Sequence, residues 1–95
     1  MSDKDTMIQR MHAQVDKLDG RIDELKAKVK KGKADARSEY AEQVESMRKR
    51  RDELSAKIDE MRSASDDAWE ELKTGFERAY DKLSDSVDRA ANRLS

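Results

Sequence analysis

The chain has 95 residues, of which 45% are charged and 35% hydrophobic, and its formal net charge at pH 7 is −1. It has no cysteine and a single histidine, which excludes disulfides and thiolate metal sites and disfavours a histidine-based metal or catalytic site. No stretch of 18 apolar residues exists, and the acidic N-terminus lacks the apolar region of a signal peptide. We therefore expect one small cytoplasmic domain, 1–95, without a membrane span.

The composition leaves disorder and long helices as the two structural classes. Leu, Ile, Val and Phe total only 14 residues, a share typical of disordered chains. Two observations favour helices: 21 bases nearly balance 22 acids, and Ala, Glu, Lys, Arg and Leu make up about half of the chain. The order of the apolar residues decides between the two classes.

The first apolar stripe has strict heptad spacing. Its members are alternately three and four residues apart, with β-branched residues at heptad position a and Met or Leu at position d. This pattern predicts a helix that packs against other helices. The stripe consists of Ile8, Met11, Val15, Leu18, Ile22, Leu25 and Val29.

A second stripe follows after a spacing of eleven residues, which shifts the heptad phase without losing it. Arg51 interrupts this stripe, and we expect its stem to pack while its guanidinium reaches an acid at the edge. Because one glycine in a helix costs only about 1 kcal/mol, we favour one continuous helix over about 4–62, with a break near Gly32 as the alternative. The second stripe consists of Tyr40, Val44, Met47, Leu54, Ile58 and Met61.

Residues 63–65 are predicted to form the turn before a last helix at about 66–94. Ser65 is a good N-cap, and the acids that follow it suit the first turn of a helix. The apolar residues of this segment recur every eleven positions, a hendecad that predicts a nearly straight helix. They are Trp69, Leu72, Phe76, Tyr80, Leu83, Val87, Ala91 and Leu94.

Charge is unevenly divided along the chain and indicates which segments pair. Residues 21–51 carry 11 bases and 6 acids, whereas residues 52–95 carry 7 bases and 12 acids. A parallel dimer of the first stripe would bring like charges together, so the basic segment needs an acidic neighbour. An antiparallel hairpin about residue 64 puts the basic run that ends at Arg51 near Glu77 and Asp81.

These observations predict an all-α protein in which a long helix and a shorter helix form an antiparallel coiled-coil hairpin. An isolated helix would leave most of its apolar area in water, so we expect association. The favoured form is a homodimer in which the partner's N-terminal segment completes each bundle. The alternative is a closed, spectrin-like three-helix bundle within one chain.

Several segments carry a family resemblance, and the most specific is 67–75, with the sequence Asp-Ala-Trp-Glu-Glu-Leu-Lys-Thr-Gly. The weaker matches are at residues 26–28, 33–36, 38–40, 48–53 and 91–94. Together they resemble small bacterial coiled-coil proteins known as a stress-response family, over nearly the whole chain. The resemblance implies a cytoplasmic protein with a role in stress, no known catalysis and no agreed mechanism.

No catalytic, cofactor or metal site is predicted, and we expect a protein that is not an enzyme. His12 has only Asp16 nearby as a second ligand, and the methionines fall at core spacing. The carboxylate pairs at 66–67 and 70–71 lie at the start of a helix, where acids favour the dipole and the cap. No concave site with a nucleophile motif is indicated.

Two binding surfaces are the alternatives to protein contact. The helix over 66–94 carries Trp69, Phe76 and Tyr80 on one face, which suits a membrane surface, but the same stripe is needed to fill the bundle. The basic stretch 26–51 could attract nucleic acid, but acids intervene and pairing with a helix accounts for it better. We therefore expect a non-enzymatic coiled-coil protein for self-assembly or contact with another helical protein, with peripheral lipid binding as the alternative.

Overall fold

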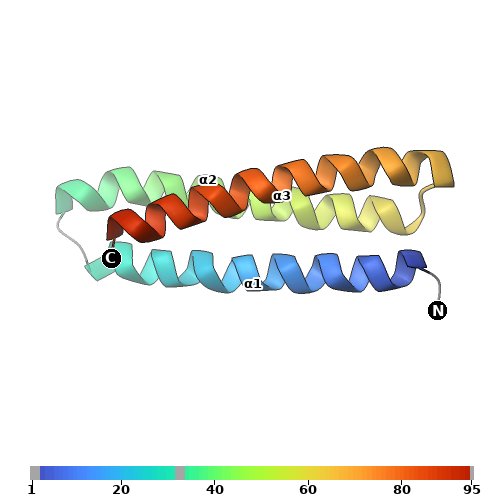
Figure 1. Cartoon of the computed structure of the whole chain (residues 1–95). Helices are drawn as coiled ribbons and strands as arrows, with labels where there is room; N and C mark the ends of the chain where they lie inside the picture. The colour runs from blue at the N-terminus through green and yellow to red at the C-terminus, as the bar shows by residue number, and fades with distance from the viewer. Residues whose placement is uncertain (1–2, 32–33, 95) are drawn as a thin grey trace.

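The computed structural model describes residues 3–31 and 34–94, with side chains described for 3–31 and 38–93, and contains three α-helices and no strand in these ranges. The helices are α1 (Asp3–Lys31), α2 (Ala34–Arg62) and α3 (Asp66–Leu94), each of 29 residues. They lie side by side along one long axis, with α1 and α3 running one way and α2 the other (Figure 1). The predicted all-α class with packed helices is confirmed.

The helices form a closed three-helix bundle, which is the alternative that the sequence left open. Every pair of helices is in contact. The helix favoured over 4–62 is instead two helices, and the chain reverses direction between Lys31 and Ala34 (Figure 1). Folding back is favourable because it buries the stripe of α1 against that of α2 within one chain. The chain therefore supplies by itself the bundle that a partner's segment was expected to complete, while Gly32 lies outside the described residues.

The core of the bundle is made from the apolar stripes. All seven stripe residues of α1 are buried, and so are all those of α2 except Tyr40. Tyr40, Leu72 and Tyr80 are half-buried against this core, and the side chain of Leu94 lies outside the described part. The buried residues are Ile8, Met11, Val15, Leu18, Ile22, Leu25, Val29, Val44, Met47, Leu54, Ile58, Met61, Trp69, Phe76, Leu83, Val87 and Ala90.

A seven-residue repeat and Val87 are buried along α3, and the predicted hendecad agrees with this core at Trp69, Phe76, Leu83 and Val87. Tyr80 and Ala91, which the hendecad assigns to the stripe, are only half-buried. A helix in contact with two neighbours keeps a repeat of about 3.5 residues toward the core, and the phenol of Tyr80 favours a place near water. The residues of the repeat are 5%, 1%, 0% and 3% exposed, in the order Trp69, Phe76, Leu83 and Ala90.

A short turn at residues 63–65 joins α2 to α3. The Ala64 N–H donates to the carbonyl of Met61 at 3.3 Å, and the Trp69 N–H donates to the carbonyl of Ser65 at 2.7 Å. The Ser65 hydroxyl accepts from the Ala68 N–H at 3.4 Å. Ser65 is therefore the N-cap of α3 expected from the sequence, and it satisfies one of the free N–H groups of the first turn.

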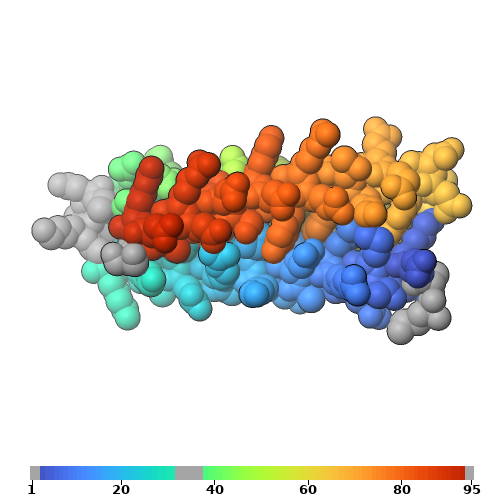
Figure 2. All heavy atoms as spheres, in the orientation of Figure 1, coloured from blue at the N-terminus to red at the C-terminus, as the bar shows by residue number. Residues whose placement is uncertain are grey.

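The bundle is a rod with extents of 49 × 20 × 17 Å. The start of α1 and the turn at 63–65 lie at one end, and the end of α3 lies at the other (Figure 1). Figure 2 shows α1 and α3 side by side along one whole face, with long side chains standing out from it. Within the described ranges, each helix is too polar or too short in its apolar stretches to traverse a lipid bilayer.

Candidate functional site

The aromatic face of α3, for which lipid contact was the alternative to core packing, points into the bundle. Trp69 and Phe76 are buried, and the ring of Tyr80 stacks on Phe76 with ring centres 6.1 Å apart. The ammonium group of Lys4 lies 5.5 Å from the centre of the Trp69 ring, a cation–π contact. These rings belong to the core, so contact with lipid would require α3 to leave the bundle.

His12 is half-buried at the edge of α1 and contacts Arg62 of α2. The distance between the His12 Nε2 atom and the Arg62 guanidinium is 2.8 Å. Because a guanidinium has no acceptor, the imidazole nitrogen accepts this hydrogen bond. In the part of the chain that the structure describes, no group of three His, Asp or Glu side chains is arranged to hold a metal ion.

The acidic start of α3 forms an ion pair with α1. The Asp66 carboxylate accepts from Lys4 Nζ at 2.7 Å. This hydrogen bond, and then the positive charge of Lys4, lower the pKa of the Asp66 carboxyl below its ordinary value. The Asp66 side chain is 96% exposed, so water and salt screen the pair and its contribution to stability is small.

Arg51 sits within the stripe of α2, and its guanidinium reaches acids, as expected from the sequence. It pairs with Asp19 of α1 and, at 2.8 Å, with Asp52. Burial acts to lower the pKa of Arg51, but the hydrogen bonds and charges of Asp52 and Asp19 outweigh it and raise the pKa above its ordinary value. Glu77 and Asp81, the acids expected near this basic run, instead line a groove between α1 and α3.

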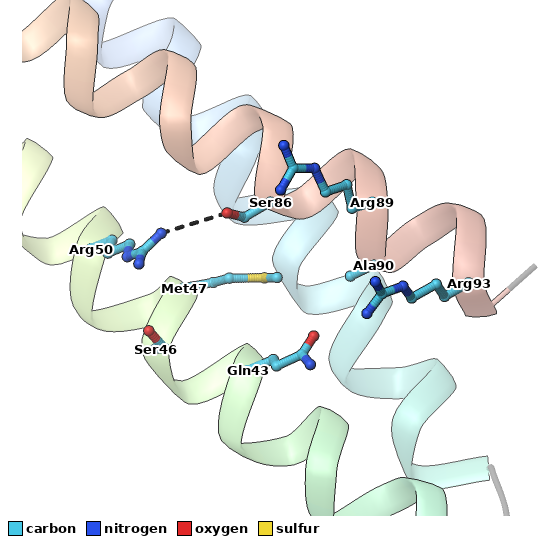
Figure 3. Close-up of a pocket in the computed structure, with 8 residues that line it drawn as sticks. All are labelled: Gln43, Ser46, Met47, Arg50, Ser86, Arg89, Ala90 and Arg93. Carbon is cyan, nitrogen blue, oxygen red and sulfur yellow. Dashed lines mark hydrogen bonds between the residues drawn. The ribbon is translucent and has the colours of Figure 1, made fainter.

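Three arginines that the sequence analysis did not bring together line one groove between α2 and α3 (Figure 3). We call it the arginine groove, and its volume is about 250 Å³. Arg50 donates a hydrogen bond of 3.5 Å to the Ser86 hydroxyl, whereas Arg89 and Arg93 have no ion pair with any side chain that the structure describes. The lining residues are Gln43, Ser46, Met47, Arg50, Ser86, Arg89, Ala90 and Arg93.

The floor of the arginine groove explains why it is open. Met47 from α2 and Ala90 from α3 are both buried there. Because Ala90 is the smallest residue of the seven-residue repeat of α3, it fills less of the space between the helices than its counterparts do. The sequence signal for the groove is weak: Arg89 and Arg93 are four residues apart on one helix face, but only the packing of α2 against α3 adds Arg50.

A second groove runs between α1 and α3, near the start of both helices. We call it the α1–α3 groove, and its volume is about 350 Å³. Its floor is apolar, and its rim carries a base from α1 and two acids from α3. The lining residues are Met7, Arg10, Met11, Gln14, Phe76, Glu77, Tyr80 and Asp81.

Comparison with family models, curated proteins and solved structures finds no match to this chain. The resemblance to a bacterial stress-response family therefore stays a prediction from the sequence. The features of the described surface that point to a function are the arginine groove and the α1–α3 groove.

Proposed function

We propose that this chain is a non-enzymatic helical-bundle protein that acts through protein contact, first of all with a second copy of itself. In line with the family resemblance, we place this action in the bacterial cytoplasm and in the response to stress. The observation that carries the proposal is the α1–α3 groove, because its apolar floor lies between rims of opposite charge. Such a surface suits the docking of helices.

The floor of this groove offers apolar area that one chain alone leaves partly in water. Met11 and Phe76 are buried at its base, whereas Met7 and Tyr80 are only half-buried. Aromatic residues and methionine are enriched at protein interfaces, where they bury much surface at low entropic cost. A second copy that covers Met7 and Tyr80 would therefore gain hydrophobic stabilisation.

The rims of the groove favour a two-fold symmetric contact. A two-fold axis parallel to the helices places α1 of each copy opposite α3 of the other, so Arg10 of each copy faces Glu77 and Asp81 of the other. The helices as wholes agree with this arrangement, since α1 has 8 bases and 6 acids and α3 has 5 bases and 8 acids. Opposite charges across the contact set its register and speed the encounter.

The test is sedimentation equilibrium over a concentration range that extends through the micromolar region. We expect a reversible rise in mass from 11.0 kDa toward twice that value. Arg10→Glu alone, and the pair Glu77→Arg with Asp81→Arg alone, should each abolish the dimer because like charges then meet. An equimolar mixture of these two variants should restore it as a heterodimer.

Arg78→Glu is the matched control, since Arg78 is exposed on α3 and lies outside the groove. It should leave the dimer unchanged. A single species of 11.0 kDa at all concentrations would overturn self-association. A dimer that both charge reversals leave intact would overturn the α1–α3 groove as the contact.

A further inference from the structure

We propose that the arginine groove is a binding site for a phosphate group, carried either by a small soluble anion or by a lipid headgroup. This site is independent of the α1–α3 groove, since the two grooves share no residue and only the arginine groove is lined by residues of α2. The proposal rests on three arginines from two helices, α2 and α3, that line one groove (Figure 3).

The charged side chains in the lining of the groove are all positive. Its lining contains three arginines and no acid, although the chain as a whole has a net charge of −1. Two acids that are close in sequence are engaged elsewhere: Glu45 pairs with Arg48 at 3.5 Å, and Asp88 pairs with Arg21. The lining therefore has a local excess of positive charge, which an anion can neutralise.

The stability of the helices explains the positions of these three arginines only in part. A cation in the last turn of α3 is favoured by the helix dipole, which accounts for Arg93. The dipole does not account for Arg50, which lies well inside α2. Like charges four residues apart, such as Arg89 and Arg93, slightly destabilise a helix. A bound anion would offset the repulsion between Arg89 and Arg93 by attracting both guanidinium groups.

The donors match a tetrahedral dianion better than a monoanion. Each guanidinium is a planar fork that can bind two oxygens of a phosphate group. Gln43 and Ser46 add an amide and a hydroxyl to the same lining, whereas the Ser86 hydroxyl donates to the Lys82 carbonyl at 3.1 Å. Three positive charges with additional neutral donors exceed what one carboxylate can use, whereas a phosphate has more oxygens and up to two negative charges.

The floor of the groove also fits an anion site. Met47 and Ala90 are buried and apolar, so on this side the anion would lie against low-dielectric material, where attraction to the guanidinium groups is stronger than in open water. The other side is open to solvent, because all three arginines are exposed. We therefore expect modest, salt-dependent affinity for inorganic phosphate and higher affinity for pyrophosphate, which has more charge.

The experiment is a titration of the full-length ¹⁵N-labelled chain with sodium pyrophosphate at constant ionic strength, with sodium acetate as the monoanion comparison. Chemical-shift changes should gather at residues 43–50 and 86–93 and at the arginine Nε–H signals. The double variant Arg89→Gln with Arg93→Gln should bind pyrophosphate about tenfold more weakly. The affinity of Arg89→Lys with Arg93→Lys for pyrophosphate should lie between these two, because lysine keeps the positive charge but cannot bind two oxygens as a guanidinium does.

The matched control is Lys17→Gln with Arg78→Gln, which removes two positive charges at exposed positions outside the groove. It should bind pyrophosphate as the parent chain does. Because Arg89 and Arg93 are exposed, all these variants should keep the parent's helical circular dichroism, which verifies that a loss of binding is not a loss of fold. Shifts spread over all basic residues, or equal losses in the groove and control variants, would overturn the proposal.

A second arm identifies the source of the phosphate group. The chain is sedimented with phosphatidylcholine vesicles, with and without phosphatidate. Binding that requires both phosphatidate and the groove arginines supports the site and assigns it to a lipid headgroup. Pyrophosphate binding without vesicle binding supports the site and assigns it to a soluble anion, while tighter binding of acetate than of pyrophosphate would overturn it.

Discussion

The two ends of the bundle differ in the size of their core side chains. At the end with the 63–65 turn, the core contains Met61 and Trp69, and Lys4 lies over the indole ring. At the other end the core consists of smaller side chains, such as Val29 and Val44. One helix shows the difference most clearly, because its buried seven-residue repeat shrinks steadily along the chain, in the order Trp69, Phe76, Leu83 and Ala90.

We call this decrease in side-chain size along α3 the taper. It shows that the core-facing position of one helix can fill the core in one turn and leave surface open in another. Where the repeat has a large ring, the helices are held together by apolar contact. Where it has only a methyl group, a groove lined by arginines opens between α2 and α3. Between α2 and α3 the small Ala90 side chain thus accompanies an open charged groove, while the α1–α3 groove lies beside Phe76 nearer the other end.

The largest expected effect comes from truncating the filled part of the taper. Phe76→Ala should destabilise the bundle by about 3–5 kcal/mol and Leu83→Ala by about 2–5 kcal/mol, since both side chains are almost fully buried. Urea denaturation followed by circular dichroism measures both values. A clearly larger loss in the free energy of unfolding for Leu83→Ala than for Phe76→Ala would contradict this order.

Filling the open end tests the comparison in the other direction. Ala90→Leu should increase the free energy of unfolding by about 1 kcal/mol, because the larger side chain can occupy part of the groove beside Met47. The same change should weaken pyrophosphate binding by narrowing the site. A loss of stability in thermal denaturation would show instead that the space is already closed to a larger side chain.

Paired and unpaired arginines extend the comparison to charge. Arg51→Ala should cost about 1 kcal/mol, because its partly buried stem packs and its guanidinium pairs with Asp19 and Asp52. Arg89→Ala, which breaks no ion pair with a described side chain, should change stability by less than about 0.5 kcal/mol. Urea denaturation of the two variants measures both changes. Equal losses in the free energy of unfolding would contradict the prediction.

The smallest effect concerns pH at the end with the turn. The pKa of Asp66 is lowered in the folded state. The pair with Lys4 therefore stabilises the fold at pH values above 3.8, the ordinary pKa of this carboxyl. This contribution is lost as the pH falls through the lower folded pKa. The melting temperature of the parent should therefore exceed that of Asp66→Asn slightly at neutral pH and match it in strong acid. A difference between the two melting temperatures that grows as the pH falls would contradict this prediction.

Much of the fold could be predicted from local pattern. The heptad stripe of α1 predicts its buried residues, and Ser65 with the following acids predicts the start of α3. The reversal between α1 and α2 could not be predicted with the same force. The apolar phase nearly continues across this region, and a single glycine costs a helix only about 1 kcal/mol. Packing between distant stripes, which no local window contains, decides the outcome.

The candidate sites depended even more on tertiary structure. Ala90 and Ala91 are indistinguishable as letters, so the hendecad selected Ala91, whereas the burial selects Ala90. The arginine groove needs Arg50 from the middle of α2 and two arginines from the end of α3. Their proximity follows from the antiparallel packing of α2 and α3, which the sequence pattern implies only in outline.

The odd number of helices has a mechanical consequence. Because α1 and α3 run the same way, the start of α1 and the end of α3 lie at opposite ends of a rod that is 49 Å long (Figure 1). Tension applied between these two points acts along the helix axes and loads the heptad layers in shear. Many side-chain contacts must then give way together, whereas a hairpin with both points at one end would peel open one layer at a time.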